Sequence, residues 1–377
     1  MRLLKTILTL ACLSCAPLIL GQEPDTVLTL LFTGDIMGHD GQIASARNDS
    51  TGTYEYDSVF RYITPFISSA DVATGNLEVT LGGPPYKGYP AFSSPDELAV
   101  ACRNAGFDIL VTANNHSADR GPKGIFRTLR VLDSLGIRHT GTWISPEERD
   151  IISPLMICHE SMRIALLAYT YGTNGIVVPP PATVAYIDTI RAAADIMRAE
   201  LLGADLTIIF IHWGIEYDTI PSAEQKKTAA ALRRAGADII IGSHPHVVQP
   251  VAAERDSAGI RNPVVWSMGN FVSNQRTRRR DGGIMIRLDI TAKGDTAFIS
   301  DAGYVLTWVY TPVENGKKKF YILPCAEFEK KPELFQSSGH YDSMMLYVKD
   351  ARRLLDNHGS GFREMTLTDG KWIGVTR

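Results

Sequence analysis

Cysteine is scarce in this sequence, and a large net charge, internal repeats and low-complexity linkers are absent from it. Five cysteines occur in 377 residues, and the formal net charge is −3. A charge balance this close to neutral gives no indication of nucleic-acid binding. Without repeats or linkers, a chain of this length and ordinary hydrophobic content is expected to fold as one large α/β domain or two smaller ones.

The few cysteines also limit what thiols can contribute. Cys12 and Cys15 lie in an apolar stretch near the N-terminus, which leaves Cys102, Cys158 and Cys325 for the rest of the chain. An odd number leaves at least one free thiol or an intermolecular bridge. Cys102 falls in an expected helix and Cys158 in an expected strand, and both are predicted to be small core residues.

The N-terminus carries the pattern of a secretory signal. Arg2 and Lys5 precede an apolar run over residues 6–20, which is about 15 residues long and short for a membrane span of about 20. A signal peptide is therefore expected over residues 1–21, with Gln22 at the mature N-terminus and the exported protein in the periplasm or at the cell surface. The alternative is a lipoprotein acylated on a cysteine of this run, and membrane anchoring is expected only in that case.

Two histidines, His244 and His246, stand two residues apart behind an apolar run. That run, residues 237–241, predicts a buried strand that ends in a Gly-Ser turn. A loop at the end of a strand can aim both imidazole rings at one point, which is a common way to bind a transition metal. The alternative is a pair of exposed loop histidines.

Other apolar runs of the sequence also end in polar residues. In α/β sheets the active site lies at the carboxyl ends of the strands, so these side chains are expected to meet there. The set contains no cysteine, and nitrogen and oxygen ligands suit Mn, Fe or Zn, bound as one or two ions. The polar residues that follow such runs are Asp35, Asn76, Glu78, Asn114, Asn115, His116, His212 and Asn270.

Helix signals fall between these runs, and an antiparallel pattern follows toward the C-terminus. Helices are expected where caps and apolar stripes coincide. Hairpins are expected where two runs of strand-forming residues flank a turn. The expected helices cover residues 94–106, 121–135, 189–202, 222–236 and 342–356, and the expected hairpins pair residues 151–159 with 163–170 and residues 284–290 with 296–310.

The polar segments occur in an order that resembles the CapA-type bacterial capsule-synthesis family, which is linked to poly-γ-glutamate biosynthesis. That family is similar to the calcineurin-like metallophosphoesterases, which implies an α/β fold built as a β-sandwich flanked by helices, with additional antiparallel strands on its C-terminal side. On this basis residues 22–312 are expected to form one domain, with residues 313–377 as a C-terminal extension packed on the core. The segments that carry the resemblance are residues 34–37, 76–78, 113–116, 212–217, 242–249 and 267–271.

The resemblance also implies a role for each polar residue. Asp35 and His246 resemble ligands of a first metal site, and Glu78 resembles the anion that bridges two metals. His116 resembles a histidine that acts as an acid or stabilises the leaving group. The ligands of the second site would be Asn115, His212 and His244.

Two positions depart from the phosphoesterase pattern. Met37 stands where those enzymes have a histidine, and His39 follows two residues further along. The bridging aspartate is replaced by Asn76 or Glu78. These departures leave room for amide hydrolysis or amide transfer as well as phosphoester hydrolysis.

The expected function is a metal-dependent hydrolase or amide-processing enzyme of the cell envelope, linked to capsule or poly-γ-glutamate biosynthesis. A phosphoesterase, and a non-catalytic protein that binds or tethers a capsule polymer, are the alternatives. The expected partner is an envelope or capsule polymer such as polyglutamate, and the basic run over residues 276–280 is a candidate to gather such a polyanion. The residues predicted to contact substrate are Asn76, Trp213, Glu216 and Asn270, although Trp213 and Tyr217 belong to types that more often pack.

Overall fold

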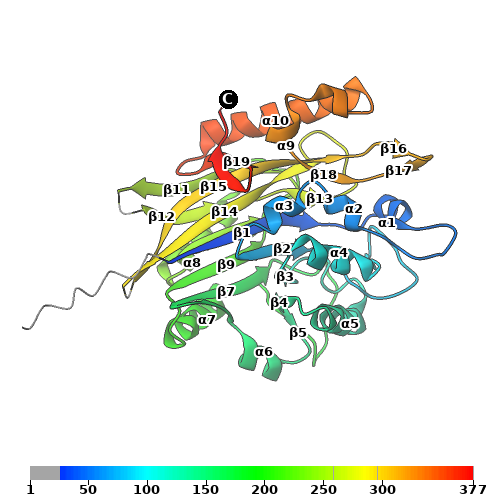
Figure 1. Cartoon of the computed structure of the whole chain (residues 1–377). Coiled ribbons are helices and arrows are strands. Elements are labelled where there is room, and N and C mark those ends of the chain that lie inside the picture. The colour runs from blue at the N-terminus through cyan, green and yellow to red at the C-terminus, as the bar shows by residue number, and fades with distance from the viewer. Residues whose placement is uncertain (1–25, 258, 295, 377) are drawn as a thin grey trace, which may run out of the picture.

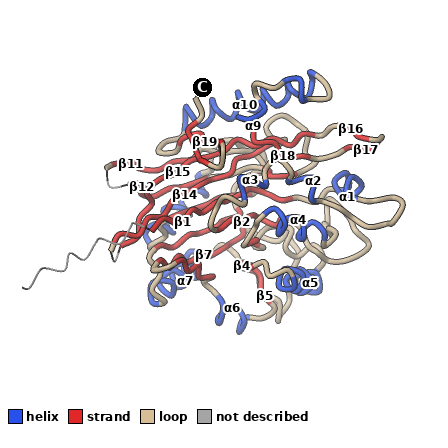
Figure 2. Tube along the Cα trace, in the orientation of Figure 1, coloured by secondary structure: helices blue, strands red, loops and turns tan. Residues whose placement is uncertain are grey.

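The computed structural model describes residues 26–257, 259–294 and 296–376, so the predicted signal peptide over residues 1–21 lies outside the described residues. The described chain forms a mixed α/β fold around a sheet of 16 strands (Figure 1). Figure 2 shows strands crossing the middle of the molecule, with α10 (Ser338–His358) along the top and α6 (Pro146–Ile152) and α7 (Thr189–Leu201) along the bottom. The predicted fold class is confirmed.

The first half of the sheet is built around β1 (Thr26–Ile36). β2, β3 and β4 follow parallel on one side of β1. On the other side β14 pairs antiparallel with β1, and β15 pairs antiparallel with β14. Short helices connect the parallel strands, so the carboxyl ends of β1, β2 and β3 share one edge. The elements are β2 (Val72–Leu77), β3 (Ile109–Val111), β4 (Arg138–Thr140), β13 (Asn270–Val272), β14 (Gly282–Lys293), β15 (Thr296–Tyr310), α1 (Asp40–Ala46), α2 (Asp57–Phe60), α3 (Thr64–Ile67), α4 (Glu97–Ala105) and α5 (Gly121–Ser134).

The second half of the sheet runs from β12 to β6. β7, β9, β10 and β12 are parallel, and β6 and β11 pair antiparallel at their sides. Helices α7 and α8 connect β7 to β9 and β9 to β10. The elements are β5 (Thr142–Trp143), β6 (Leu155–His159), β7 (Met162–Thr170), β8 (Thr183–Val184), β9 (Leu206–His212), β10 (Ile239–Ser243), β11 (Val251–Asp256), β12 (Gly259–Val265), α6 (Pro146–Ile152), α7 (Thr189–Leu201) and α8 (Ala223–Arg234).

The two halves of the sheet face each other across one apolar core. They are joined at β12 and β15 through the pair Ile260 and Ile299. Leu30 and Phe32 of β1 lie in the same buried cluster as Ile208 of β9, whereas Leu31 belongs to a second cluster with the helices α2 to α4. Because side chains alternate along a strand, each half packs one face on the other half and the opposite face on helices. The result is a β-sandwich flanked by helices.

The C-terminal segment closes one side of this sandwich. Helix α10 buries Met344, Tyr347 and Leu355 in the central cluster, and the Tyr347 hydroxyl donates a hydrogen bond to the carbonyl of Gly283 at 2.5 Å. The C-terminal strand β19 pairs with β15. The elements are β16 (Val313–Glu314), β17 (Lys317–Lys318), β18 (Tyr321–Pro324), α9 (Cys325–Phe328), a 3₁₀ turn (Pro332–Leu334), α10 (Ser338–His358), β19 (Arg363–Thr368) and β20 (Lys371–Gly374).

Three local expectations need correction. The strand expected from residue 151 begins at Leu155, because Ser145 caps a helix that runs from Pro146 to Ile152. The late helix is longer than residues 342–356. Cys158 is exposed, since β6 is an edge strand, and therefore it is not a core residue, whereas Cys102 is buried as expected.

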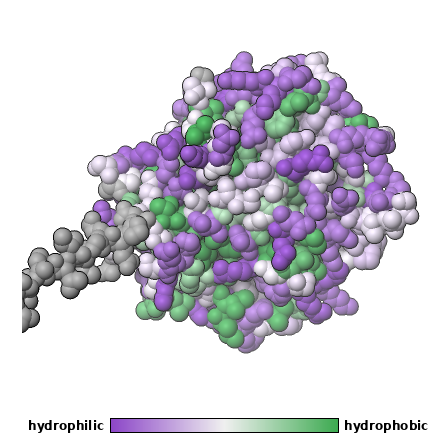
Figure 3. Space-filling model, in the orientation of Figure 1, coloured by the Kyte–Doolittle hydropathy of each residue, from purple (hydrophilic) through white to green (hydrophobic). Residues whose placement is uncertain are grey.

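On the face shown in Figure 3, apolar residues form small patches among hydrophilic ones. None of the helices in the described ranges combines the length and the apolar character that crossing a membrane requires.

Candidate metal centre

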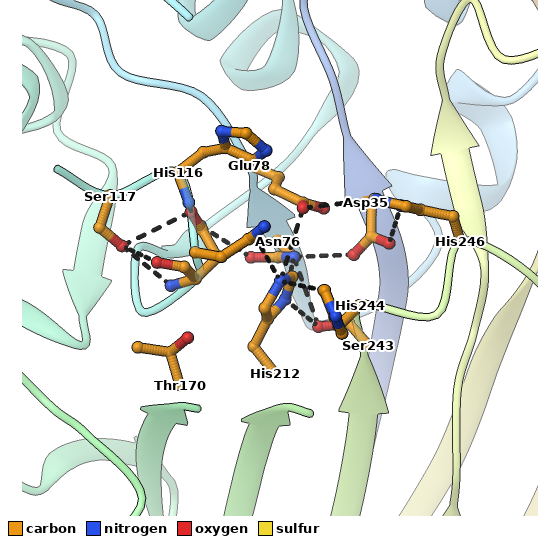
Figure 4. Close-up of polar contacts among 12 residues, drawn as sticks. Asp35, Asn76, Glu78, His116, Ser117, Thr170, His212, Ser243, His244 and His246 are labelled. Carbon is orange, nitrogen blue, oxygen red and sulfur yellow. Dashed lines mark hydrogen bonds and ion pairs between the residues drawn. The ribbon is translucent and has the colours of Figure 1, made fainter. Parts of the chain in front are cut away.

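Polar side chains from both halves of the sandwich meet at the carboxyl ends of the strands (Figure 4). Asp35 lies near the end of β1, and Glu78 follows β2. His212 ends β9, while His244 and His246 follow β10. Each apolar strand is buried and ends where the chain turns, so the first polar residues after it are delivered to one place. All five side chains are buried.

Three ligand-type atoms converge around the Nε2 atom of His212. It lies 2.8 Å from Oδ1 of Asn115, 3.2 Å from Nδ1 of His244 and 3.5 Å from Oε1 of Glu78. A neutral imidazole nitrogen makes one hydrogen bond, so three partners exceed its capacity. Ligands about 2.1 Å from one metal ion lie about 3.0–3.5 Å from their neighbours, which is the observed spacing. These residues therefore fit a shared cation.

The side chain of Glu78 gives the clearest sign that this cluster suits a cation. It is fully buried, and within the described ranges neither carboxylate oxygen accepts a hydrogen bond from a donor group. Burial, and next the negative charge of Asp35, raise the pKa of the Glu78 carboxyl well above its usual value. A hydrogen bond between the carboxyl groups of Glu78 and Asp35 would require one of the two to be protonated. A buried carboxyl without a partner is costly, and a bound cation would remove that cost.

His246 links Glu78 to Asp35. Its Nδ1 atom lies 3.1 Å from Oδ2 of Asp35 and 3.1 Å from Oδ1 of Asn270, and its Nε2 atom lies 3.8 Å from Oε1 of Glu78. Two ligand sets in the described part of the chain hold their atoms within 4.8 Å of one another: Asp35 with Glu78 and His212, and Glu78 with His244 and His246. Because Glu78 belongs to both sets, it has the position of a bridge, and the cluster fits one or two ions.

Amide and hydroxyl groups hold the candidate ligands in place. The Asn76 side-chain amide donates to Oδ1 of Asp35 at 2.8 Å, and the Asn114 amide donates to Oδ1 of Asn76 at 3.2 Å. Oγ of Ser243 lies 3.0 Å from Nδ1 of His212, which fixes that ring with Nε2 toward the cluster. Asn76 is thus an internal support of Asp35, and its contact with substrate stays a prediction.

His116 lies beside the cluster with a carboxylate behind it. Its Nδ1 atom is 2.8 Å from Oδ2 of Asp119, and its ring packs edge-on against Phe92 at 4.6 Å. Asp119 also accepts a hydrogen bond from the backbone of Phe92, so it is fixed at both sides. This pair orients the imidazole as a base is oriented by a carboxylate in catalytic dyads. Asp119 was not predicted, although its spacing of three residues from His116 would have indicated it.

The backbone at the histidine pair is strained. His244 has a φ of 101° and His246 a φ of 58°, both in the left-handed region that residues with side chains rarely adopt. Such strain persists where the surrounding structure fixes it, and it concentrates at functional sites. Here the strained turn at Pro245 directs the imidazole rings of His244 and His246 toward the cluster of candidate ligands.

The remaining residues predicted to contact substrate take different positions. Trp213 is buried against α7 and α8, and its indole donates to the carbonyl of Trp266 at 3.0 Å, so it packs in the core, and its contact with substrate stays a prediction. Asn270 holds His246 and is likewise a support. Glu216 is exposed, contacts the Tyr217 hydroxyl, and lies near enough to add to the raised pKa of Glu78.

The two positions that depart from the phosphoesterase pattern are also resolved. Met37 is a buried core residue, packed with the helices of the first half. His39 begins α1, with Nδ1 3.1 Å from Oε1 of Gln42, and burial lowers its pKa to about 4. His39 belongs to neither ligand set, so it does not replace the missing histidine.

The sequence profile of the family described as "Bacterial capsule synthesis protein PGA_cap" matches residues 29–275. The "Capsule biosynthesis protein CapA" of Bacillus anthracis is 30% identical over 273 residues, which cover 68% of this chain and 63% of that protein. The "PGA biosynthesis protein CapA" of Bacillus subtilis (strain 168) is 30% identical over 282 residues, covering 69% of this chain and 67% of that protein. The chain thus spans less than two thirds of the length of the Bacillus anthracis relative.

Solved structures align with lower similarity. The NAD nucleotidase of Haemophilus influenzae is 12% identical with a TM-score of 0.46, covering 90% of this chain and 64% of that one. The calcineurin-like phosphoesterase YfkN of Bacillus subtilis is 14% identical with a TM-score of 0.40, covering 88% and 99%. The profile match extends over well more than half of the 377 residues and includes every candidate ligand. The chain therefore belongs to the bacterial capsule synthesis protein family PGA_cap.

Proposed function

We propose that this chain is a metal-dependent hydrolase or amide-processing enzyme of the cell envelope that acts in capsule or poly-γ-glutamate biosynthesis. The observation that carries the proposal is the Glu78 carboxyl, buried without a hydrogen-bond donor among three histidines and Asp35. The donor set of imidazole, carboxylate and amide oxygen suits Mn, Fe or Zn. When bound, such an ion lowers the pKa of a coordinated water and polarises the bond to be cleaved.

The residues of the chain supply orientation and proton transfer. Asp119 fixes Nδ1 of His116, which leaves Nε2 of that ring to exchange a proton with the leaving group. Asn115 is held by Asn174, to which its amide donates at 3.2 Å, so its Oδ1 faces His212. The cluster is buried at strand ends, which limits the water that reaches it.

The decisive experiment combines metal analysis with two substrates. Purified protein is analysed for metal, then assayed on bis(p-nitrophenyl) phosphate and on γ-glutamyl p-nitroanilide, before and after EDTA treatment and Mn²⁺ reconstitution. We expect bound Mn, Fe or Zn and cleavage of at least one substrate that EDTA abolishes. No divalent transition metal even after reconstitution would refute the proposal. Metal and polymer binding without cleavage would favour the tethering alternative.

Export is part of this proposal. Arg2, Lys5 and the apolar run after them support a mature N-terminus near Gln22. N-terminal sequencing of protein from the native host measures this directly. An acylated Cys15 at the N-terminus would establish a lipoprotein instead, and an intact Met1 in the cytoplasm would remove the envelope assignment.

A further inference from the structure

The basic run over residues 276–280 ends at the rim of the metal centre. The side-chain amide of Asn270 donates to the backbone carbonyl of Arg280 at 2.8 Å. The oxygen of the same side chain lies 3.1 Å from Nδ1 of His246. One buried asparagine therefore fixes Arg280 relative to a candidate metal ligand.

The side chain of Arg280 lies on an exposed tyrosine beside the centre. Its guanidinium carbon is 3.8 Å from the ring centroid of Tyr217, a cation–π contact, and Arg280 also donates to the Tyr217 hydroxyl. The Tyr217 ring is 6.2 Å from that of His246 and is 41% exposed. The backbone N–H of Tyr217 donates to Pro245 at 2.8 Å, and its φ of 70° is strained. Arg280 and Tyr217, which we call the rim pair, are thus fixed on the segment that carries His244 and His246, and they remain open to solvent.

Arg278 and Arg279 pair with a carboxylate, whereas Arg280 lies on the Tyr217 ring. Arg278 and Arg279 contact the carboxylate of Asp350 in α10 at 2.6 and 3.4 Å. Arg279 adopts a φ of 72°, which lets the backbone turn between these contacts and Arg280. In the described part of the chain Arg280 forms no ion pair with a carboxylate, so its charge is available to a ligand.

A pocket adjoins the rim pair on the side of α10. Thr219, two residues after Tyr217, lines it together with Arg279, Arg353 and His358. Arg353 also contacts Asp350, at 3.2 Å, so three arginines share one carboxylate. Positive charge is therefore in excess around the pocket, whereas at the rim Glu216 lies beside Tyr217 and offsets the charge of Arg280.

We propose that the rim pair Arg280 and Tyr217, continued by the pocket at Arg279 and Arg353, binds successive carboxylates of an acidic polymer next to the metal centre. Arginine matches a carboxylate with its planar pair of donors. We call Arg280, Tyr217, Arg279 and Arg353 together the track. Asp350 and Glu216 lie beside it and repel an anionic ligand more strongly the higher its charge, which favours singly charged carboxylates over phosphates. Cleavage of the bound polymer rests on the proposed function, whereas binding of the polymer to the track requires no metal.

The test measures binding of a fluorescent γ-linked glutamate oligomer by anisotropy, to EDTA-treated and Mn²⁺-reconstituted protein. Wild type is compared with Arg280→Gln, Arg280→Lys, Arg353→Gln and the control Arg234→Gln. Arg234 is exposed at the end of α8, which leads into the start of β10 and so lies at the edge of the sheet opposite the site. Thermal unfolding verifies that each variant folds.

We expect Arg280→Gln to bind about 10-fold more weakly or worse, with or without Mn²⁺, because a charge-assisted hydrogen bond is lost. Arg353→Gln should weaken binding less, Arg280→Lys should restore part of it, and Arg234→Gln should match wild type. On a cleaved oligomer, Arg280→Gln should raise KM and leave kcat nearly unchanged. Equal affinity of wild type and Arg280→Gln would overturn the proposal, as would a preference for inorganic polyphosphate over the oligomer.

The outcomes separate this proposal from the proposed function. Binding that depends on Arg280 in a protein that cleaves nothing would keep the track and reject the hydrolase. Metal-dependent cleavage with an affinity that Arg280→Gln leaves unchanged would keep the hydrolase and reject the track.

Discussion

Replacing Glu78 by glutamine separates a metal ligand from a structural carboxyl. Gln has nearly the shape of Glu but carries no charge and coordinates metals weakly. Both oxygens of Glu78 are buried without a donor, and its carboxylate belongs to both candidate ligand sets. The substitution should therefore remove the metal's stabilising effect while leaving the metal-free fold intact.

The magnitude follows from binding linkage. An ion at 100 times its dissociation constant stabilises the folded state by about 2.7 kcal/mol, which for a chain of this size raises Tm by roughly 3 °C. If Glu78→Gln weakens affinity about 100-fold, the same ion concentration gives only about 0.4 kcal/mol. Metal-free Glu78→Gln should be at least as stable as metal-free wild type, because an unpartnered buried carboxyl costs about 1–3 kcal/mol or more.

The assay compares four samples by calorimetry and urea unfolding: wild type and Glu78→Gln, each EDTA-treated and each with Mn²⁺. Wild type should gain several degrees with Mn²⁺ and the variant less than about 1 °C. An equal gain in both proteins would refute the bridging role. A metal-free variant less stable than wild type by more than about 2 kcal/mol would show that Glu78 has a structural partner.

Four further substitutions distinguish ligand, acid–base, packing and capping roles. His116→Ala should retain its metal and lose roughly 10²–10⁴-fold in turnover, and unchanged turnover on every cleaved substrate would contradict the mechanism. His244→Ala should reduce metal content measured by inductively coupled plasma mass spectrometry, whereas full occupancy would exclude it as a ligand. Trp213→Ala should destabilise the fold by about 3–5 kcal/mol in urea unfolding without altering the preference between substrates, and a changed preference would support its predicted substrate role. Ser222→Ala should cost about 1 kcal/mol by removing the capping box of α8, with metal content unchanged; a loss of metal would indicate that α8 positions the site.

Much of the fold could be predicted because apolar runs and helix caps in the sequence indicate which segments form buried strands and helices. Apolar runs gave the central strands, and caps gave helices such as α7, where Asp188 accepts from the backbone at Ile190. Local patterns failed where two signals competed. Ile151 and Ile152 are strand-forming residues, but the cap at Ser145 extends a helix over them. The sequence also contains no signal that β6 lies at the edge of the sheet, where Cys158 is exposed.

The convergence of the site could be predicted for a different reason. A polar residue directly after a buried strand can go only to the sheet's edge, so Asp35, Glu78 and His212 were expected to meet. Their supports could not be predicted, because partners such as Asn114 and Ser243 depend on distances between strands remote in sequence. For the same reason Asn76 and Asn270 were expected to contact substrate, whereas each holds a neighbouring ligand.

The candidate metal ligands and the residues proposed to bind the polymer lie in different parts of the chain. Every candidate metal ligand lies within residues 29–275, the part that matches the family profile. The arginine run begins at Arg276, and its anchor Asp350 lies on α10, beyond that part. The candidate metal centre is thus built from the segment that matches the family, while the proposed polymer track depends on contacts between the end of that segment and the C-terminal helix α10. Asp350→Asn should accordingly strengthen oligomer binding, because it removes a repelling carboxylate and frees Arg278 and Arg279, and it should leave metal content unchanged, because Asp350 belongs to neither candidate ligand set. Anisotropy and metal analysis on one preparation measure both effects, and a loss of metal in this variant would show that the two parts do not act separately.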